Sequence, residues 1–295
     1  MTPSEPRVSI VCVTYGRRDF ALRCLESCVT QDYANLEVIA VVNPSGDGTE
    51  QAIAERLPQV RLMRAHRNLG FFTGLNLAIA NATGDYVMTV DDDAYFLSTD
   101  AIRRLVAAMR REPQLGAVTC NLEGPTESPM TGGDRYVHLY TTGFTLMPRK
   151  VFTEWIGYYP DGMFAGGESF MCADLWDRGL RVKRVADVRM FHAKTQHGRY
   201  GAWVEDTYRS QARYAIEKEP LPLVLPSLAS KFARSFVQAC RARRVGAWIQ
   251  IWAEVVTSCP AALRKRKPIR WRTQRLLWRL RRDTVRDVEA LAGHS

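Results

Sequence analysis

The chain lacks the signatures of several common protein classes. Its seven cysteines are odd in number and none stands in a C-x-x-C pair, which argues against a disulfide framework and against a zinc knuckle. Residues 1–7 are polar and contain proline, unlike the apolar centre of a secretory signal peptide. We therefore expect reduced thiols and a cytoplasmic location.

A long uninterrupted apolar run is also missing from the most hydrophobic part of the tail. The stretch 245–263 is interrupted by Gln250, Glu254 and Pro260, so it would make a poor transmembrane helix. The spacing predicts amphipathic helices there instead.

Acidic residues are scarce in the C-terminal 65 residues, which contain that stretch. Residues 231–295 hold 16 Lys and Arg against 4 Asp and Glu, whereas residues 1–230 hold 25 against 27. Trp248, Trp252 and Val256 lie four apart on one helical face. Aromatic and basic residues in this pattern are typical of a helix lying on the anionic inner face of a membrane. The alternative is a helix packed on its own domain or on a partner subunit.

Three consecutive aspartates, Asp91, Asp92 and Asp93, follow the apolar, β-branched run 86–90, which predicts a buried strand. Carboxylates held this close together repel one another, and a divalent cation among them offsets that cost. Mg²⁺ and Mn²⁺ prefer oxygen ligands and often connect them to phosphate groups. The triplet therefore predicts a Mn²⁺ or Mg²⁺ site, and the alternative is an acidic surface loop.

Strand and helix patterns alternate along the first 120 residues. This βαβ alternation predicts an α/β fold with a doubly wound, mostly parallel sheet and helices on both faces. Ligands of such sheets bind at the carboxyl ends of the strands, where the aspartates lie. Strands are expected at 8–14, 36–42, 60–64, 86–90 and 115–120, and helices at 19–31, 50–56, 75–80 and 102–111.

The pattern is less regular past residue 120. Residues 121–141 show no clear periodicity, and we interpret them as a mobile loop near the site. A helix is expected from 168 to 178, followed by two short strands at 182–185 and 188–191. His192 ends the second strand, and a neutral imidazole there is a candidate for a third metal ligand or a phosphate contact. The alternative is a capped strand end.

Four motifs occur in order along residues 7–200. They are the strand and turn V-S-I-V-C-V-T-Y-G-R at 8–17, V-N-P-S-G-D-G-T at 42–49, N-L-G-F-F-T-G-L-N at 68–76, and the acidic strand at 84–93. Together they resemble the nucleotide-sugar-dependent glycosyltransferases of family two, which have the GT-A fold. The resemblance implies a GT-A-like catalytic domain over residues 1–215 and leaves a helical, basic region over residues 216–295.

The resemblance also implies roles for the matched residues. Thr14 and Tyr15 are expected beside the base and ribose of a nucleotide-diphosphate sugar. Asn43 stands where the family usually has an aspartate that pairs with uracil, and an amide both accepts and donates, so the base preference stays open. The implied donor-binding residues are Thr14, Tyr15, Arg17, Asn43, Asn68, Gly70, Asn76, Asp91 and Asp92, and the implied metal ligands are Asp91, Asp93 and His192.

Glu168 matches the first position of the family's E-D catalytic pair, but the second position is Ser169. Glu168 is then the one acid left as a general base, because Asp174 lies nearly two helical turns further on. The alternative for Glu168 is a carboxylate that stabilises a helix N-terminus. Arg199 and Tyr200 are weaker candidates for closing over the diphosphate, and Trp155, Tyr158, Tyr159 and Phe164 for lining the acceptor pocket.

The expected function is metal-dependent transfer of a hexosyl or deoxyhexosyl group to a hydroxyl acceptor. A single base and a single displacement predict inversion at the anomeric carbon. The acceptor is not indicated, although a lipid-linked one would suit the basic tail. The alternatives are a non-catalytic nucleotide-sugar binder, favoured by Ser169, and a nucleic-acid binder using the tail, which carries no recognisable RNA- or DNA-binding motif.

Overall fold

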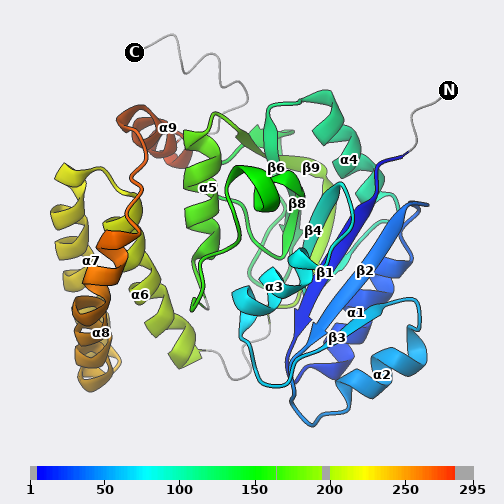
Figure 1. Cartoon of the computed structure of the whole chain (residues 1–295), viewed down its shortest axis with the longest axis horizontal. Helices are drawn as coiled ribbons and strands as arrows, with labels where there is room; N and C mark the ends of the chain where they lie inside the picture. The colour runs from blue at the N-terminus through cyan, green and yellow to red at the C-terminus, as the bar shows by residue number, and fades with distance from the viewer. Residues whose placement is uncertain (1–4, 164, 195–199, 283–295) are drawn as a thin grey trace.

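The structure is a computed structural model that describes residues 5–163, 165–194 and 200–282 (Figure 1). Within these ranges a nine-stranded sheet has the order β3-β2-β1-β4-β8-β6-β9-β5, with β7 beside β9. The strands are β1 Val8–Thr14, β2 Leu36–Val42, β3 Arg61–Arg64, β4 Tyr86–Asp91, β5 Ala94–Phe96, β6 Leu115–Glu123, β7 Arg135–Tyr136, β8 Phe144–Pro148 and β9 Arg181–His192.

Helices flank this sheet and form a separate group at the C-terminal end (Figure 1). The helices are α1 Arg18–Val29, α2 Thr49–Arg56, α3 Phe71–Ala80, α4 Ala101–Arg111, the short π-helix η1 Val151–Trp155, α5 Gly167–Asp177, α6 Tyr200–Lys218, α7 Leu221–Arg241, α8 Val245–Arg264 and α9 Trp271–Arg282.

The first four strands confirm the predicted parallel βαβ arrangement. Strand β1 pairs in parallel with β2 and β4, and all seven of its residues are buried. A strand buried on both faces needs a nearly continuous apolar sequence, which β1 has. In this register Thr14 lies opposite Val42, and Val13 lies opposite Asp91. The carboxyl ends of three strands therefore meet at one edge of the sheet.

The second half of the sheet is mixed. Strand β8 runs antiparallel to both β4 and β6, and β6 runs parallel to β9. The two strands expected at 182–185 and 188–191 are one strand, β9, because its middle stays bonded: the Ala186 amide donates to Oδ1 of Asp134 at 2.9 Å.

The expected loop at 121–141 is also more structured than its sequence indicated. Strand β6 extends to Glu123, and Gly124 pairs with Glu127 as an isolated bridge. Strand β7 then adds to β9. The rest of 121–141 is irregular, as expected, and the short edge pairings were missed because they depend on partners far along the chain, which local periodicity does not reveal.

Helices α6, α7 and α8 pack chiefly on one another, whereas α9 packs against α5 and reaches the main hydrophobic core through Leu280. Helix α6 runs without interruption through residue 215, and the proposed division of the chain there stays a prediction. The indole N–H groups of Trp248 and Trp252 both donate to the buried Ser235 hydroxyl at 3.0 Å, so these rings turn toward α7. In the described ranges, no helix is both long enough and apolar enough to cross a membrane.

Candidate active site

The three aspartates form a partly buried acidic group at the end of β4. Asp91 is the last residue of the strand, and Asp92 and Asp93 lie in the following turn with exposed fractions of 2% and 4%. Burial at this position follows from the strand order, because β1 covers one side and β8 the other. Buried carboxylates need cationic or hydrogen-bonding neighbours to stay ionised.

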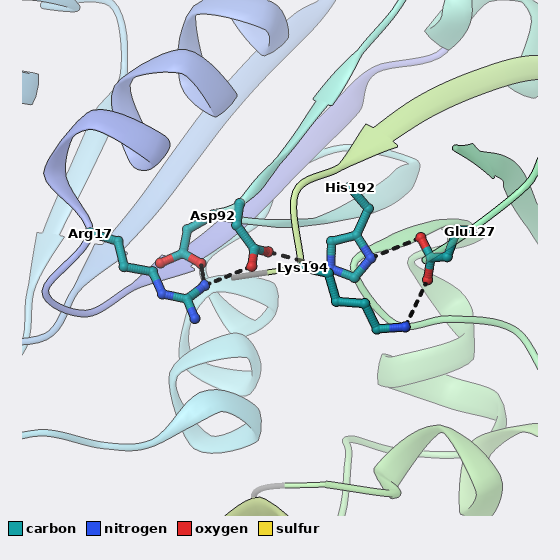
Figure 2. Close-up of polar contacts among 6 residues, drawn as sticks. Arg17, Asp92, Glu127, His192 and Lys194 are labelled. Atoms are coloured by element: carbon teal, nitrogen blue, oxygen red, sulfur yellow. Dashed lines mark hydrogen bonds and ion pairs between the residues drawn. The ribbon is translucent and has the colours of Figure 1, made fainter. Parts of the chain in front are cut away.

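Arg17 supplies one such neighbour (Figure 2). It lies just before α1, and its Nη1 atom is 3.1 Å from Oδ1 of Asp92 and 2.9 Å from Oδ2 of Asp93. The guanidinium side chain is itself only 7% exposed. One cation therefore holds two adjacent carboxylates in a fixed position. Arg17 was expected to contact the donor, and that contact stays a prediction.

His192 reaches the acidic group from β9, whose end lies opposite Ala94 of β5. Its Nε2 atom is 3.5 Å from Oδ1 of Asp93, and its Nδ1 atom is 3.1 Å from Oε2 of Glu127 (Figure 2). An ionised carboxylate only accepts, so Nδ1 carries the proton in the neutral ring. Burial lowers the pKa of His192, but the carboxylates of Asp93, Asp91 and Glu127 outweigh it and raise the pKa overall.

These residues fit a divalent cation in both geometry and charge. Asp91, Asp93 and His192 each offer one ligand atom, and these atoms lie within 4.8 Å of one another. Two carboxylate oxygens and one imidazole nitrogen suit Mn²⁺ and are compatible with Mg²⁺. The structure thus brings together the three residues expected as ligands.

The charge of the same group also favours a cation. The three aspartates and Glu127 bring four carboxylates together, and Arg17 and Lys194 are among the cationic side chains that pair with them. A divalent ion offsets the repulsion within such a cluster of carboxylates.

Gly143 leaves the room that Asp91 needs. It lies just before β8, and its carbonyl accepts a hydrogen bond from the Asp91 amide at 3.2 Å. A Cβ atom at residue 143 would stand 2.1 Å from the Asp91 carboxyl carbon, far inside contact distance. A glycine is therefore required for the Asp91 side chain to take this position.

Glu168 is the second residue of α5 and lies beside the same segment. Its Oε2 atom is 3.4 Å from the hydroxyl of Thr142, the neighbour of Gly143. Burial raises the pKa of the Glu168 carboxyl above its ordinary value. A raised pKa is a property of acids that work as general bases near neutral pH. Asp174 faces Lys218 instead, with Oδ1 to Nζ at 2.6 Å.

The residues expected near the nucleotide lie at the ends of β1 and β2. The Thr14 hydroxyl is buried and has no hydrogen-bond partner within the described part of the chain, whereas Tyr15 is 52% exposed. Oδ1 of Asn43 accepts from the Leu69 amide at 2.8 Å, and Oδ1 of Asn68 accepts from the Gly70 amide at 2.9 Å. These bonds shape the loop before α3, and the donor contacts stay predictions.

Asn76 is placed differently from the other expected donor residues. Its side-chain NH₂ donates to the Tyr159 carbonyl at 2.9 Å, and its Oδ1 accepts from the Tyr159 amide at 3.0 Å. The Tyr159 hydroxyl in turn lies 3.0 Å from that of Tyr140, and both rings are buried. The amide of Asn76 thus fixes the segment before α5, while its contact with a donor stays a prediction.

Several site residues escaped sequence reasoning. Glu127 and Lys194 form an ion pair at 3.5 Å beside His192, and Thr142 and Gly143 separate Glu168 from Asp91. Glu127 lies in the segment expected to be a mobile loop, so no periodicity marked it. Two of the weaker candidates, Arg199 and Phe164, lie outside the described residues.

A protein-family model described as glycosyl transferase family 2 matches residues 9–172, more than half of the chain. The chain belongs to this family. The matched segment contains the acidic group and Glu168 but ends before His192 and before helices α6 to α9.

Curated relatives match a shorter part. An uncharacterized glycosyltransferase, YibD, of Escherichia coli is 31% identical over 126 residues, covering 42% of this chain and 36% of that protein. The N-acetylglucosaminyl-diphospho-decaprenol L-rhamnosyltransferase of Mycobacterium tuberculosis is 30% identical over 130 residues, covering 40% and 42%. The chain thus matches well under half the length of these relatives.

Solved structures extend the likeness to most of the chain. TarS of S. aureus in complex with UDP-GlcNAc is 16% identical with a TM-score of 0.66, covering 94% of this chain and 87% of that one. The mannosyltransferase PcManGT of Pyrobaculum calidifontis in complex with GDP-Man and Mn²⁺ is 21% identical with a TM-score of 0.58, covering 88% and 86%. At these identities the likeness shows the fold, and it confirms the expected GT-A architecture.

Replacing Gly143 by alanine should weaken Mn²⁺ binding. The new methyl group must push the Asp91 carboxylate aside, which removes one ligand, so we expect a loss of affinity of about tenfold or more with a modest fall in melting temperature. Isothermal titration calorimetry with Mn²⁺ measures the change. Gly246→Ala is the matched control, because a Cβ there meets nothing within 4 Å. Equal Mn²⁺ affinity in both variants would contradict the assigned position of Asp91.

Replacing Glu127 by glutamine should also lower Mn²⁺ affinity, although Glu127 offers no ligand of its own. The change removes the carboxylate that keeps the His192 proton on Nδ1, and losses of roughly 10–100-fold are usual for such partners. The control is Glu123→Gln, four residues earlier, which pairs with Arg189 instead. If the two variants bind Mn²⁺ equally well, Glu127 does not orient His192.

Proposed function

We propose that this chain transfers a sugar from a nucleotide-diphosphate sugar to a hydroxyl acceptor, in a reaction that needs Mn²⁺ or Mg²⁺ and inverts the anomeric carbon. One observation carries the proposal. The candidate base Glu168 and the candidate ligand Asp91 contact the adjacent residues Thr142 and Gly143. A proton acceptor and a phosphate-binding cation are thereby held on one short segment of backbone.

The donor would lie along the carboxyl ends of β1, β2 and β4. Thr14 ends β1 and Asn43 directly follows β2. Asp91, Asp93 and His192 would hold the cation that binds the diphosphate. When bound, the cation neutralises charge that builds on the departing diphosphate. The solved relatives hold GDP-Man or UDP-GlcNAc. The amide of Asn43 is compatible with either base, so the nucleotide is left open.

Glu168 would take the proton from the acceptor hydroxyl as that oxygen attacks the anomeric carbon. Its raised pKa supports this role, because a less acidic carboxylate is a stronger base. Its place in the first turn of α5 also stabilises the charged form through the helix dipole. Asp174 is engaged by Lys218, which leaves Glu168 as the acid that faces the site segment.

The acceptor class is proposed from the relatives and from the tail. The mycobacterial relative is named for an acceptor sugar carried on decaprenol diphosphate. A lipid-linked hydroxyl acceptor would also account for the concentration of basic residues at 231–295. We therefore propose action at the inner face of a membrane, with the enzyme bound peripherally.

A donor that binds through the cation should stabilise the fold only when Mn²⁺ is present. At about 100 times its Kd, a ligand adds about 2.7 kcal/mol, which corresponds to roughly 3–6 °C in melting temperature for a chain of this size. Thermal shift with UDP-, GDP- and dTDP-sugars, with and without Mn²⁺, measures this. Asp93→Asn should abolish the Mn²⁺-dependent shift, whereas Asp187→Asn on the exposed surface should keep it.

The donor that gives the shift also identifies the nucleotide. A shift that is the same with Mn²⁺ and with excess EDTA would remove the cation from donor binding.

Replacing Glu168 by glutamine should reduce turnover by roughly 10²–10⁴-fold while donor binding is kept. Glutamine retains the shape but cannot take a proton. Transfer and donor hydrolysis are measured by release of nucleoside diphosphate, with Glu154→Gln on the exposed face of η1 as control. Because burial disfavours the Glu168 charge, the glutamine variant should melt at the same or a higher temperature at pH 7.

The pH dependence gives a second measure of the same base. Protonation of Glu168 stops the reaction, so kcat/KM should fall as pH drops through a pKa above the ordinary glutamate value of about 4.3. That acidic limb should vanish in Glu168→Gln. Full turnover by the glutamine variant would exclude Glu168 as base, and a wild-type protein that binds donors without transfer or hydrolysis would favour the non-catalytic binder that Ser169 allows.

A further inference from the structure

Helices α7 and α8 carry an apolar surface that the rest of the described chain leaves uncovered. Figure 1 shows both helices on the side of α6 that is turned away from the sheet. On α7 the exposed large apolar residues other than Val237 recur at intervals of four and seven, and α8 repeats the pattern. They are Leu221 (74%), Leu225 (77%), Phe232 (43%), Phe236 (41%), Val245 (37%), Ile249 (57%), Val256 (69%) and Leu263 (54%).

The two stripes join into one surface, called here the α7–α8 face. The ring of Phe232 contacts both Trp248 and Trp252, and the ring of Phe236 contacts Trp248, with centroids 4.7 to 5.0 Å apart. Phe236, further along α7, contacts Trp248, whereas Phe232 also reaches Trp252, further along α8. The two helices are therefore antiparallel. Phe232 and Phe236 lie at the seam and are still exposed, so the apolar surface continues from one helix to the other.

The size of this face sets it apart from scattered apolar surface residues. Helix α8 has 20 residues and is therefore roughly 30 Å long. Its stripe runs from Val245 near one end to Leu263 near the other. Contiguous apolar patches of this extent on a protein surface mark an interaction site.

Basic residues occupy both ends of the α7–α8 face. Arg241 ends α7, and Arg243 and Arg244 lie in the turn after it. Arg264 ends α8, and Lys265 and Lys267 follow it; all six are exposed. From residue 231 to 282 the described chain has one acidic side chain, Glu254, which pairs with Arg209 of α6. The face therefore combines an apolar centre with cationic ends.

We propose that the α7–α8 face binds the surface of an anionic lipid bilayer, with both helices lying in the plane of the interface. Exposed leucine, isoleucine, valine and phenylalanine side chains would enter the acyl boundary, and the arginines at each end would pair with anionic headgroups. Two antiparallel helices with stripes on a common side present a flat surface, which matches a bilayer. The proposal deepens the proposed function by naming the membrane-binding surface, and its membrane role rests on that function.

Charge decides between a bilayer and a second copy of the chain. Two copies that met through this face would bring their arginine clusters close together, and like charges across an interface oppose association. An anionic bilayer has the complementary charge. Aromatic packing also argues for a preformed surface, because the Trp248 and Trp252 indoles are anchored on Ser235 and hold α8 against α7.

The test is flotation of the full chain with vesicles of phosphatidylcholine containing about 30% phosphatidylglycerol, compared with pure phosphatidylcholine. We expect binding to the anionic vesicles that weakens several-fold when salt is raised from about 0.1 to 0.5 M. The double variant Ile249→Ser, Val256→Ser should lose about tenfold or more of the partition coefficient, because two exposed apolar side chains no longer enter the lipid. Arg243→Gln with Arg244→Gln should reduce anionic selectivity.

Leu97→Ser is the matched control, since Leu97 is 40% exposed but lies on the sheet domain. Melting temperature, Mn²⁺ binding and Mn²⁺-dependent donor hydrolysis in solution should be unchanged in the serine double variant, which separates this proposal from the proposed function. Three results would overturn it: no binding to anionic vesicles, equal binding by the double variant, or a lipid-free dimer that the same two substitutions dissociate.

Discussion

The balance of charge among buried carboxylates is the constraint on which the catalytic edge of this protein depends. Asp92 and Asp93 are almost fully buried, and a single guanidinium, that of Arg17, touches both. Such an arrangement is costly without compensation, because desolvated like charges repel strongly at short range. The Arg17 contact fixes the turn between β4 and β5, and a divalent ion bound at the same edge would further reduce the repulsion among the carboxylates.

Two glycines allow neighbouring segments to approach Asp91 and His192 closely. Gly143 lets the chain before β8 pass against Asp91, and Gly124 lets the end of β6 pass against the His192 carbonyl, where a Cβ would come within 2.2 Å. The antiparallel strand β8 inserts between β4 and β6, so Thr142 and Gly143 lie between the acidic group and Glu168. The proposed metal ligation and proton transfer would both depend on this one backbone segment, so a change in its position would affect both.

The sequence predicted what is encoded locally. Strands β1, β2 and β4 carry apolar runs that local patterns reveal, and Asp91, Asp93 and His192 were expected together because their motifs resemble those of the family. Glu127 and the continuity of β9 were missed because both depend on pairing between segments about 60 residues apart. Trp248 and Trp252 were expected on a helix face that either lies on a membrane or packs within the protein, and their indole groups take the second role by packing α8 on α7.

Because Trp248 and Trp252 pack between α7 and α8, the two helices are held together while other apolar side chains on them stay exposed. A single amphipathic helix has one apolar face, so that face can pack either against its own domain or against a lipid surface, but not against both. Helix α8 carries a wider apolar arc, in which Ile251, Val255 and Ala262 are buried while the rest stays exposed, and it packs on both α6 and α7. The internal contacts hold the pair in one orientation, so an interface formed by the exposed part would act on a rigid body rather than on a flexible tether. Because α7 and α8 pack on α6, binding through their exposed face would also fix how the sheet and its acidic edge are oriented relative to the membrane.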